Sequence, residues 1–201
     1  MTNLLDLAFK DPFRESIARA LRSDPHRVPG SLHFASVLAY GDFILANGKT
    51  IRCEAIPGIS GVHTSTQLEE HNGGSRVQLK RILTHFHFDQ PSVMIEQHPA
   101  KPSTGVLHGT GKGTGGLLPG KASFSQYLIL TLEGRPLANR DALVMTAERV
   151  DEWPPIGSTF VSEAPTKFYD LEQVNNSKAE LVATLAACKA INVTQLFVPD
   201  R

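Results

Sequence analysis

The stretch GDFILANGKTIRCEAI, residues 41–56, contains two apolar runs separated by Asn47 and Gly48. An Asn-Gly pair between such runs is the strongest short-range signal for a β-hairpin, because both residues accept the positive φ that a tight turn needs. The stretch therefore predicts two antiparallel strands. It also sets a two-residue period that the neighbouring sequence continues.

Strand signals extend outward from this hairpin as segments rich in β-branched and aromatic residues, bounded by Gly, Pro and Asn. They lie at residues 31–40, 61–68, 75–90, 92–98, 103–109, 121–134, 141–153, 158–164 and 166–171. Strands and helices do not alternate along the chain, which argues against a doubly wound parallel sheet. We expect a mainly β fold: a single antiparallel β-barrel, or a sandwich, of about eight to ten strands.

The two ends of the chain have a helical pattern. Residues 1–30 begin with apolar residues at helical spacing, and residues 172–201 start with Asn and Ser cap candidates followed by a similar stripe. We therefore expect one domain over residues 1–201. Its barrel spans residues 31–171, and both terminal helical segments pack outside it.

The composition limits the classes of partner that the chain is expected to bind. The chain has 201 residues, and its 20 Lys and Arg balance its 20 Asp and Glu. Zero net charge argues against broad attraction to nucleic acid or to an anionic membrane. No segment has the apolar length of a transmembrane helix or the pattern of a signal peptide. We expect a cytoplasmic protein with a small-molecule ligand or substrate and no nucleic-acid or membrane partner. Edge strands make a homodimer a further expectation.

The only two cysteines, Cys53 and Cys188, lie far apart in the sequence. They form no Cys-x-x-Cys or zinc-ribbon spacing. In a reducing compartment, two buried thiols are expected in preference to one long-range disulfide.

The segment LTHFHFDQP, residues 83–91, places His85 and His87 two positions apart. In a strand, residues two apart point to the same face, so the imidazoles share a face with Arg81, opposite Phe86. Two arrangements remain open. The histidines can line the polar mouth of a barrel. Alternatively, a bulge within residues 75–90 can put the phenylalanines in the core and the histidines outside.

If they face inward, His85 and His87 are candidate ligands of a divalent transition metal such as zinc, with Glu96 as a third ligand. Other candidates for completing the site are His63, Asp89, His98 and His108. The HFHF string resembles the zinc strand of α-type carbonic anhydrases. Because the match covers only these few residues, we interpret it as convergent strand chemistry.

The same face suggests catalysis. His85 and His87 would supply acid–base or metal-assisted chemistry, and Arg81 and Tyr127 would contact the substrate. The leading hypothesis is a small-molecule enzyme with its site inside a barrel, acting as a lyase or isomerase through isomerisation, cyclisation, hydration or elimination. No organic cofactor is expected. The alternatives are a non-catalytic binding protein for a hydrophobic small molecule, with the histidines as orienting donors, and a β-sandwich protein-interaction module.

A glycine-rich loop occupies residues 109–120. It is not a phosphate-binding P-loop, because Val106 stands where the first glycine is required and no helix can follow directly. The loop is either a lid over a pocket, closing with Leu117 and Leu118, or a plain flexible connection.

Overall fold

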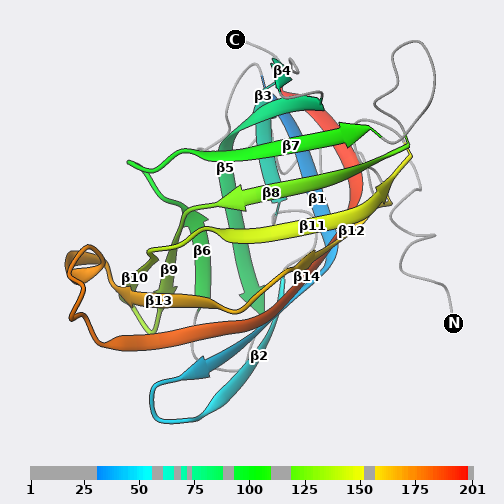
Figure 1. Cartoon of the computed structure of the whole chain (residues 1–201). Coiled ribbons are helices and arrows are strands. Elements are labelled where there is room, and N and C mark those ends of the chain that lie inside the picture. Colours follow the sequence, from blue (N-terminus) through cyan, green and yellow to red (C-terminus); the bar gives the residue numbers. More distant parts are fainter. Residues whose placement is uncertain are drawn as a thin grey trace, which may run out of the picture.

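The computed structural model describes residues 31–55, 61–65, 69–71, 74–87, 93–109, 119–151 and 157–198. Within these ranges the chain is almost entirely β-strand, and its strands form one antiparallel sheet (Figure 1). The prediction of a mainly β, antiparallel fold is confirmed. The helical segment predicted for residues 1–30 lies outside the described residues.

The strands of the described chain are short except for three. The earlier ones are β1 Ser31–Leu45, β2 Thr50–Ala55, β3 Gly61–Ser65, β4 Glu69–His71, β5 Gly74–His87, β6 Val93–Gln97 and β7 Ser103–Gly109. The later ones are β8 Gly120–Gln126, β9 Leu128–Leu132, β10 Arg135–Asn139, β11 Leu143–Val150, β12 Thr159–Ser162, β13 Thr166–Asp170 and β14 Leu181–Val198. A 3₁₀ turn, η1 Leu171–Gln173, follows β13.

The predicted hairpin forms between β1 and β2. The amide of Gly48 donates to the Leu45 carbonyl at 2.9 Å, and Gly48 has a φ of 81°. The Asn47 side chain accepts the amide of Lys49 at 3.0 Å. This is a three-residue loop with glycine in the left-handed position, a common hairpin connection. The local Asn-Gly signal was therefore sufficient to locate the turn.

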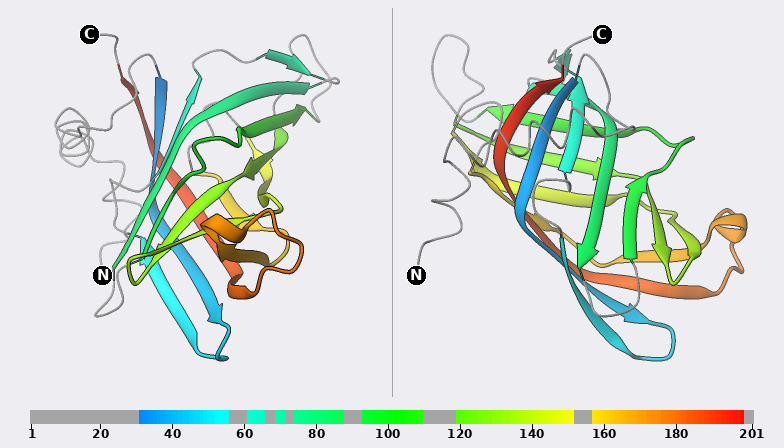
Figure 2. Two further views of the ribbon diagram at one scale, coloured as in Figure 1. Left: turned by 90° about the vertical axis from the view of Figure 1, so that its left-hand side faces the viewer. Right: turned by 180° about the vertical axis from the view of Figure 1, so that it is seen from behind.

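The three long strands organise the sheet. The strand order is β2-β1-β3-β5-β6-β9-β10-β13-β14-β12-β11-β8-β7, with further pairings of β1 with β14, β2 with β5 and β5 with β7. The first and last strands, β1 and β14, pair from Ser31–Val198 to Leu45–Ala183 and lie side by side in Figure 2. Because β5 and β14 each have different partners along their two halves, the sheet curls around its inner face.

The predicted C-terminal helix within residues 172–201 is wrong, because β14 occupies Leu181–Val198. The spacing of Leu181 and Leu185 fits a helix, but a separation of four also satisfies the two-residue period of a strand. In β14 the buried residues alternate, at Ala183 and Leu185, and β1 supplies the backbone partners. Tertiary pairing thus overrides a weak helical preference.

The segment predicted as one strand, residues 121–134, is two strands, since β8 ends at Gln126 and β9 starts at Leu128. Strand β10, Arg135–Asn139, was not predicted because Pro136 signals a break. The chain reverses tightly before it, with φ of 52° at Glu133 and 78° at Gly134. Two successive positive φ values are typical of a hairpin turn that matches the strand twist.

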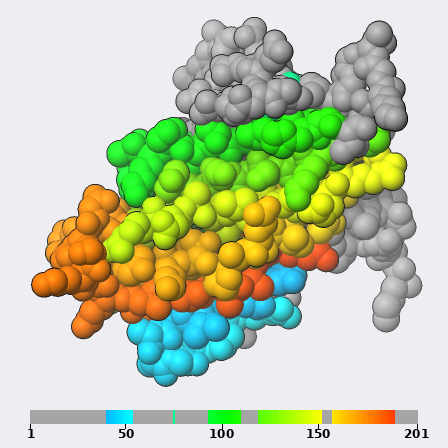
Figure 3. Space-filling model, viewed as in Figure 1, coloured from blue at the N-terminus to red at the C-terminus, as the bar shows by residue number. Residues whose placement is uncertain are grey.

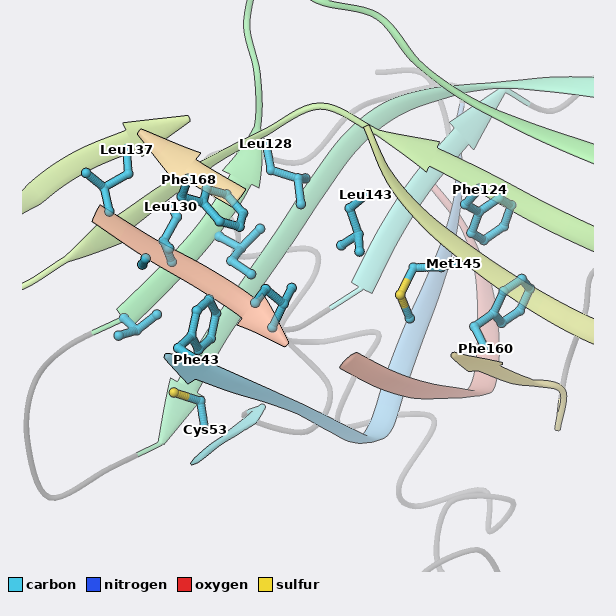
Figure 4. Packing of buried hydrophobic residues seen from close by; sticks show 14 of the residues in the cluster. Phe43, Cys53, Phe124, Leu128, Leu130, Leu137, Leu143, Met145, Phe160 and Phe168 are labelled. Atoms are coloured by element: carbon cyan, nitrogen blue, oxygen red, sulfur yellow. The ribbon is translucent and has the colours of Figure 1, made fainter. Parts of the chain in front are cut away.

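The inner face of the curled sheet carries the core. Burial alternates residue by residue along β8 and β9, so that Phe124, Leu128 and Leu130 are buried while their neighbours are partly exposed. Figure 4 shows these side chains facing others from β1, β10, β11 and β13. The rings of Phe124 and Phe160 stack with centroids 4.8 Å apart. The opposite face forms a continuous outer surface over β7, β8, β11 and β14 (Figure 3).

None of the described segments forms a helix with the length and apolar character that a bilayer span requires.

Candidate ligand-binding site

A hollow of about 420 Å³ lies where one end of the sheet meets two hairpin turns. Its lining residues are Leu45, Ala46, Asn47, Leu132, Glu133, Arg135, Leu137 and Val182. They come from the β1–β2 turn, the β9–β10 turn and the start of β14. The volume is within the range of about 300–1,000 Å³ that small-molecule sites occupy.

The floor of the hollow is apolar. Leu132 and Leu137 are buried members of the core, and Leu45 and Val182 pack against it. Because Leu132 continues the buried alternation of β9, the floor of the hollow is the edge of the packed core. The amide of Ala46 donates to the Val182 carbonyl at 3.0 Å, which ties the β1–β2 turn to β14. An apolar molecule would therefore meet a preformed surface here.

The rim of the hollow is polar. Arg135 donates from Nε and Nη2 to Oδ2 of Asp170, at 3.1 and 3.0 Å. This pair holds the guanidinium beside the apolar floor while the Arg135 side chain remains 56% exposed. Asn47 and Glu133 complete the rim. Apolar walls with a few placed polar groups are characteristic of sites for small molecules.

A line of polar side chains crosses the inner face where strands break. Asn139 is fully buried, accepts the Leu128 amide at 2.6 Å and donates to the carbonyls of Gln126 and Asp141, both at 2.9 Å. These bonds satisfy backbone groups that the break at residue 127 removes from the strand ladder. We call this line, Gln97, Ser103, Gln126 and Asn139, the polar belt.

Tyr127 lies at this break, and its backbone is bonded by Ser103 of the belt and by His98. Its amide donates to Ser103 Oγ at 2.8 Å, and its carbonyl accepts the His98 amide at 2.8 Å. Because side chains alternate along the strand, the Tyr127 ring points to the other face of the sheet from the buried Gln126 and Leu128. On that face, Lys101 Nζ lies 5.2 Å from the ring centroid. Tyr127 is thus on the outer face, and its predicted contact with a substrate stays a prediction.

The register places the histidine strand relative to its neighbours. Leu79 pairs with buried Ser103, whereas at the other end of β5 Leu83 pairs with exposed Glu96 and His85 with Met94. On the β3 side the register shifts between the His63–Arg81 and Thr64–Leu79 pairs, which marks an irregularity in β5. The side chains of residues 76–87 lie outside what the structure describes, so the face that His85 and His87 occupy stays a prediction.

The same register brings carboxylates next to the histidine positions. Glu54 pairs directly with His87, and Glu96 is diagonal to His85. Diagonal neighbours lie about 7–8 Å apart, within reach of long side chains. Arg81 pairs with His63 on the other side. Among the side chains that the structure describes, no group of three or more metal-ligating residues gathers.

Other titratable groups have structural roles. His98 Nδ1 accepts the amides of Ala100 and Lys101 at 3.1 and 3.2 Å, and burial together with the nearby Lys101 charge lowers the pKa of this imidazole. Both cysteines are free, as predicted, and both pair with Gly41. Burial, reinforced by Asp42, raises the pKa of each thiol to about 12. Neither is suited to nucleophilic chemistry.

Most of the glycine-rich loop, residues 110–118, lies outside the described residues, so its role as a lid stays a prediction.

Comparison with known proteins shows a shared fold. The chain resembles the solved structure of DynF from the dynemicin biosynthesis pathway of Micromonospora chersina, with a TM-score of 0.61 and 14% sequence identity. The match covers 83% of this chain and 85% of that one. No protein-family model and no curated protein matches the chain.

The sequence did not reveal the hollow. It depends on two turns, near residues 46 and 133, that lie far apart in the sequence. The second turn carries a local signal, the Glu-Gly pair at 133–134 between an apolar run and Arg135. Reading that pair as a hairpin would have found β10 and one wall of the hollow.

Proposed function

We propose that the curled sheet acts as a β-barrel that binds an apolar small molecule in the hollow between the β1–β2 and β9–β10 turns. The apolar floor of the hollow, continuous with the inner face and rimmed by Arg135, is the observation that carries the proposal. DynF belongs to a biosynthetic pathway, and such pathways act on metabolites, so the shared fold supports a role with small molecules. The binding-protein hypothesis and the enzyme hypothesis both require the chain to bind a small molecule.

Substituting Ala46→Trp tests the binding site. Ala46 is exposed and lines the hollow, so an indole there would occupy it without disturbing the core. We expect the affinity for 4-hexylphenol, measured by equilibrium dialysis, to fall about tenfold, a cost of about 1.4 kcal/mol.

The matched control is Ala164→Trp, which changes an equally exposed alanine away from the hollow. This variant should bind 4-hexylphenol like the unmodified protein. Equal affinities in all three proteins would contradict binding in the hollow.

The histidine strand supports a second proposal, a zinc site formed by His85 and His87 with a carboxylate from a neighbouring strand. Glu96 is diagonal to His85 but lies four strand positions, about 13 Å, from His87. Glu54 pairs directly with His87 and is the better third ligand for a shared ion. Imidazole with carboxylate is a common zinc ligand set. Histidine-centred turnover of a bound substrate, with Arg81 and Tyr127 as partners, would require the ligand to reach the histidine strand.

Zinc titration with elemental analysis tests this second proposal. Replacing both His85 and His87 with alanine should weaken zinc binding at least about tenfold, because two ligands are lost. His108→Ala removes an exposed histidine that pairs with Lys121 on β8 and should leave zinc binding unchanged. A wild-type protein that retains no zinc after dialysis would refute the site.

A further inference from the structure

Glu133 lies in the β9–β10 turn, at a position that a glutamate rarely takes. It has a φ of 52° and is the one non-glycine residue with a positive φ in the part of the chain that the structure describes. Turns with two successive positive φ values are built mostly from Asn, Asp and Gly, because larger side chains crowd the backbone there. The turn therefore gives no reason for a glutamate, whereas the hollow that its side chain lines offers one.

Two charged side chains line the hollow, and they differ in how they are paired. Arg135 donates twice to Asp170, at 3.1 and 3.0 Å, so the chain itself neutralises this guanidinium. The Glu133 carboxylate has no hydrogen bond or ion pair within the described ranges. Two residues from the lining segments, Lys49 and Glu180 carry opposite charges. One uncompensated negative charge therefore lies at the rim of the hollow.

This charge decides which head group a ligand can carry. An apolar body on the floor of the hollow would displace water from the rim, and removing the hydration of a carboxylate is costly unless a partner replaces it. A cationic head group is such a partner. An anionic head group would instead approach the carboxylates of Glu133 and Asp170, and juxtaposed like charges oppose binding.

We propose that the Glu133 carboxylate accepts a charge-assisted hydrogen bond from the ammonium group of a bound amphiphilic amine. The inference rests on the proposed function and names its ligand class, an amine on an apolar body that fits within about 420 Å³. The apolar body lies on Leu132 and Leu137, which belong to the packed core and close the hollow below. Glu133 is then a specificity-determining residue at the rim.

Three probes with the same apolar body test the inference by equilibrium dialysis. At about pH 7, 4-hexylbenzylamine carries an ammonium group, 4-hexylbenzyl alcohol a neutral hydroxyl and 4-hexylbenzoic acid a carboxylate. We expect the wild-type protein to bind the amine about three- to fivefold more tightly than the alcohol, since Glu133 is exposed, and to bind the acid most weakly. The preference for the amine should shrink in about 1 M NaCl, where the Debye length is about 3 Å.

Glu133→Gln removes the charge but keeps the size of the side chain at the turn. In this variant the ratio of the amine affinity to the alcohol affinity should fall to about one, with the alcohol affinity unchanged. Glu148→Gln is the matched control, because it removes the same charge from an exposed glutamate of β11 that does not line the hollow. It should keep the wild-type ratio.

The outcomes separate the inference from the function it rests on. Equal binding of amine and alcohol by the wild-type protein, or tightest binding of the acid, would overturn the inference and leave the proposed function standing. A preference for the amine that persists in Glu133→Gln, or that is lost equally in Glu148→Gln, would do the same. Failure of all three probes to bind the wild-type protein would overturn the proposed function and the inference with it.

Discussion

Replacing Asn139 with leucine is expected to lower the free energy of unfolding by about 3 kcal/mol or more, because buried hydrogen-bonding groups lose their partner. The Asn139 side chain makes three hydrogen bonds to backbone groups, and two of them, with Leu128 and Gln126, are buried. Leucine has the same number and branching of side-chain heavy atoms but cannot form hydrogen bonds, so the main cost is the loss of these bonds. Each stranded backbone group costs about 1–3 kcal/mol.

Urea denaturation followed by circular dichroism measures this loss. Asn176→Leu is the matched control: Asn176 also makes two side-chain hydrogen bonds, with Gln173 and Lys178, but it is exposed. Water replaces those bonds on substitution, so its cost should stay below about 1 kcal/mol. Equal losses of unfolding free energy in the two variants would show that the contribution of Asn139 to stability does not depend on its burial.

The same bonds explain what sequence could and could not predict. The hairpin at Asn47 and Gly48 was predictable because its signal and its structure occupy the same few residues. Most other strands were predictable because the two-residue period is also local. Asn139 gave no such signal, since two of its three partners are backbone groups of a strand break more than ten residues away.

The incorrect predictions also depend on contacts between residues that are far apart in the sequence. Leu181 and Leu185 fit both periods, and only the pairing of β14 with β1 decides between them. The histidine strand is a similar case. The alternation of residues 75–90 predicted either an inward face or a bulge, and both depend on how β5 pairs with its neighbours, where the register shifts between the Arg81 and Leu79 pairs. The hollow arises only when strands far apart in sequence meet.

The proposed function depends on which face of the sheet is the interior, and two neighbouring aromatic residues of β13 test this. Phe168 is fully buried beside Leu130 and Leu137 (Figure 4). Tyr169 has the opposite orientation and is partly exposed, with the Arg140 guanidinium 4.5 Å from its ring centroid. Consecutive residues of a strand face opposite sides, so the two differ mainly in burial.

Phe168→Ala is expected to lower the free energy of unfolding by about 3–5 kcal/mol, because a large apolar side chain is lost and a cavity remains. Tyr169→Ala removes a partly exposed ring and a cation–π contact, which costs about 1 kcal/mol. Urea denaturation of the two variants gives the comparison. A larger loss for Tyr169→Ala would place the core on the other face. The apolar floor of the hollow would then not be an extension of the core, and the binding site proposed there would have no support.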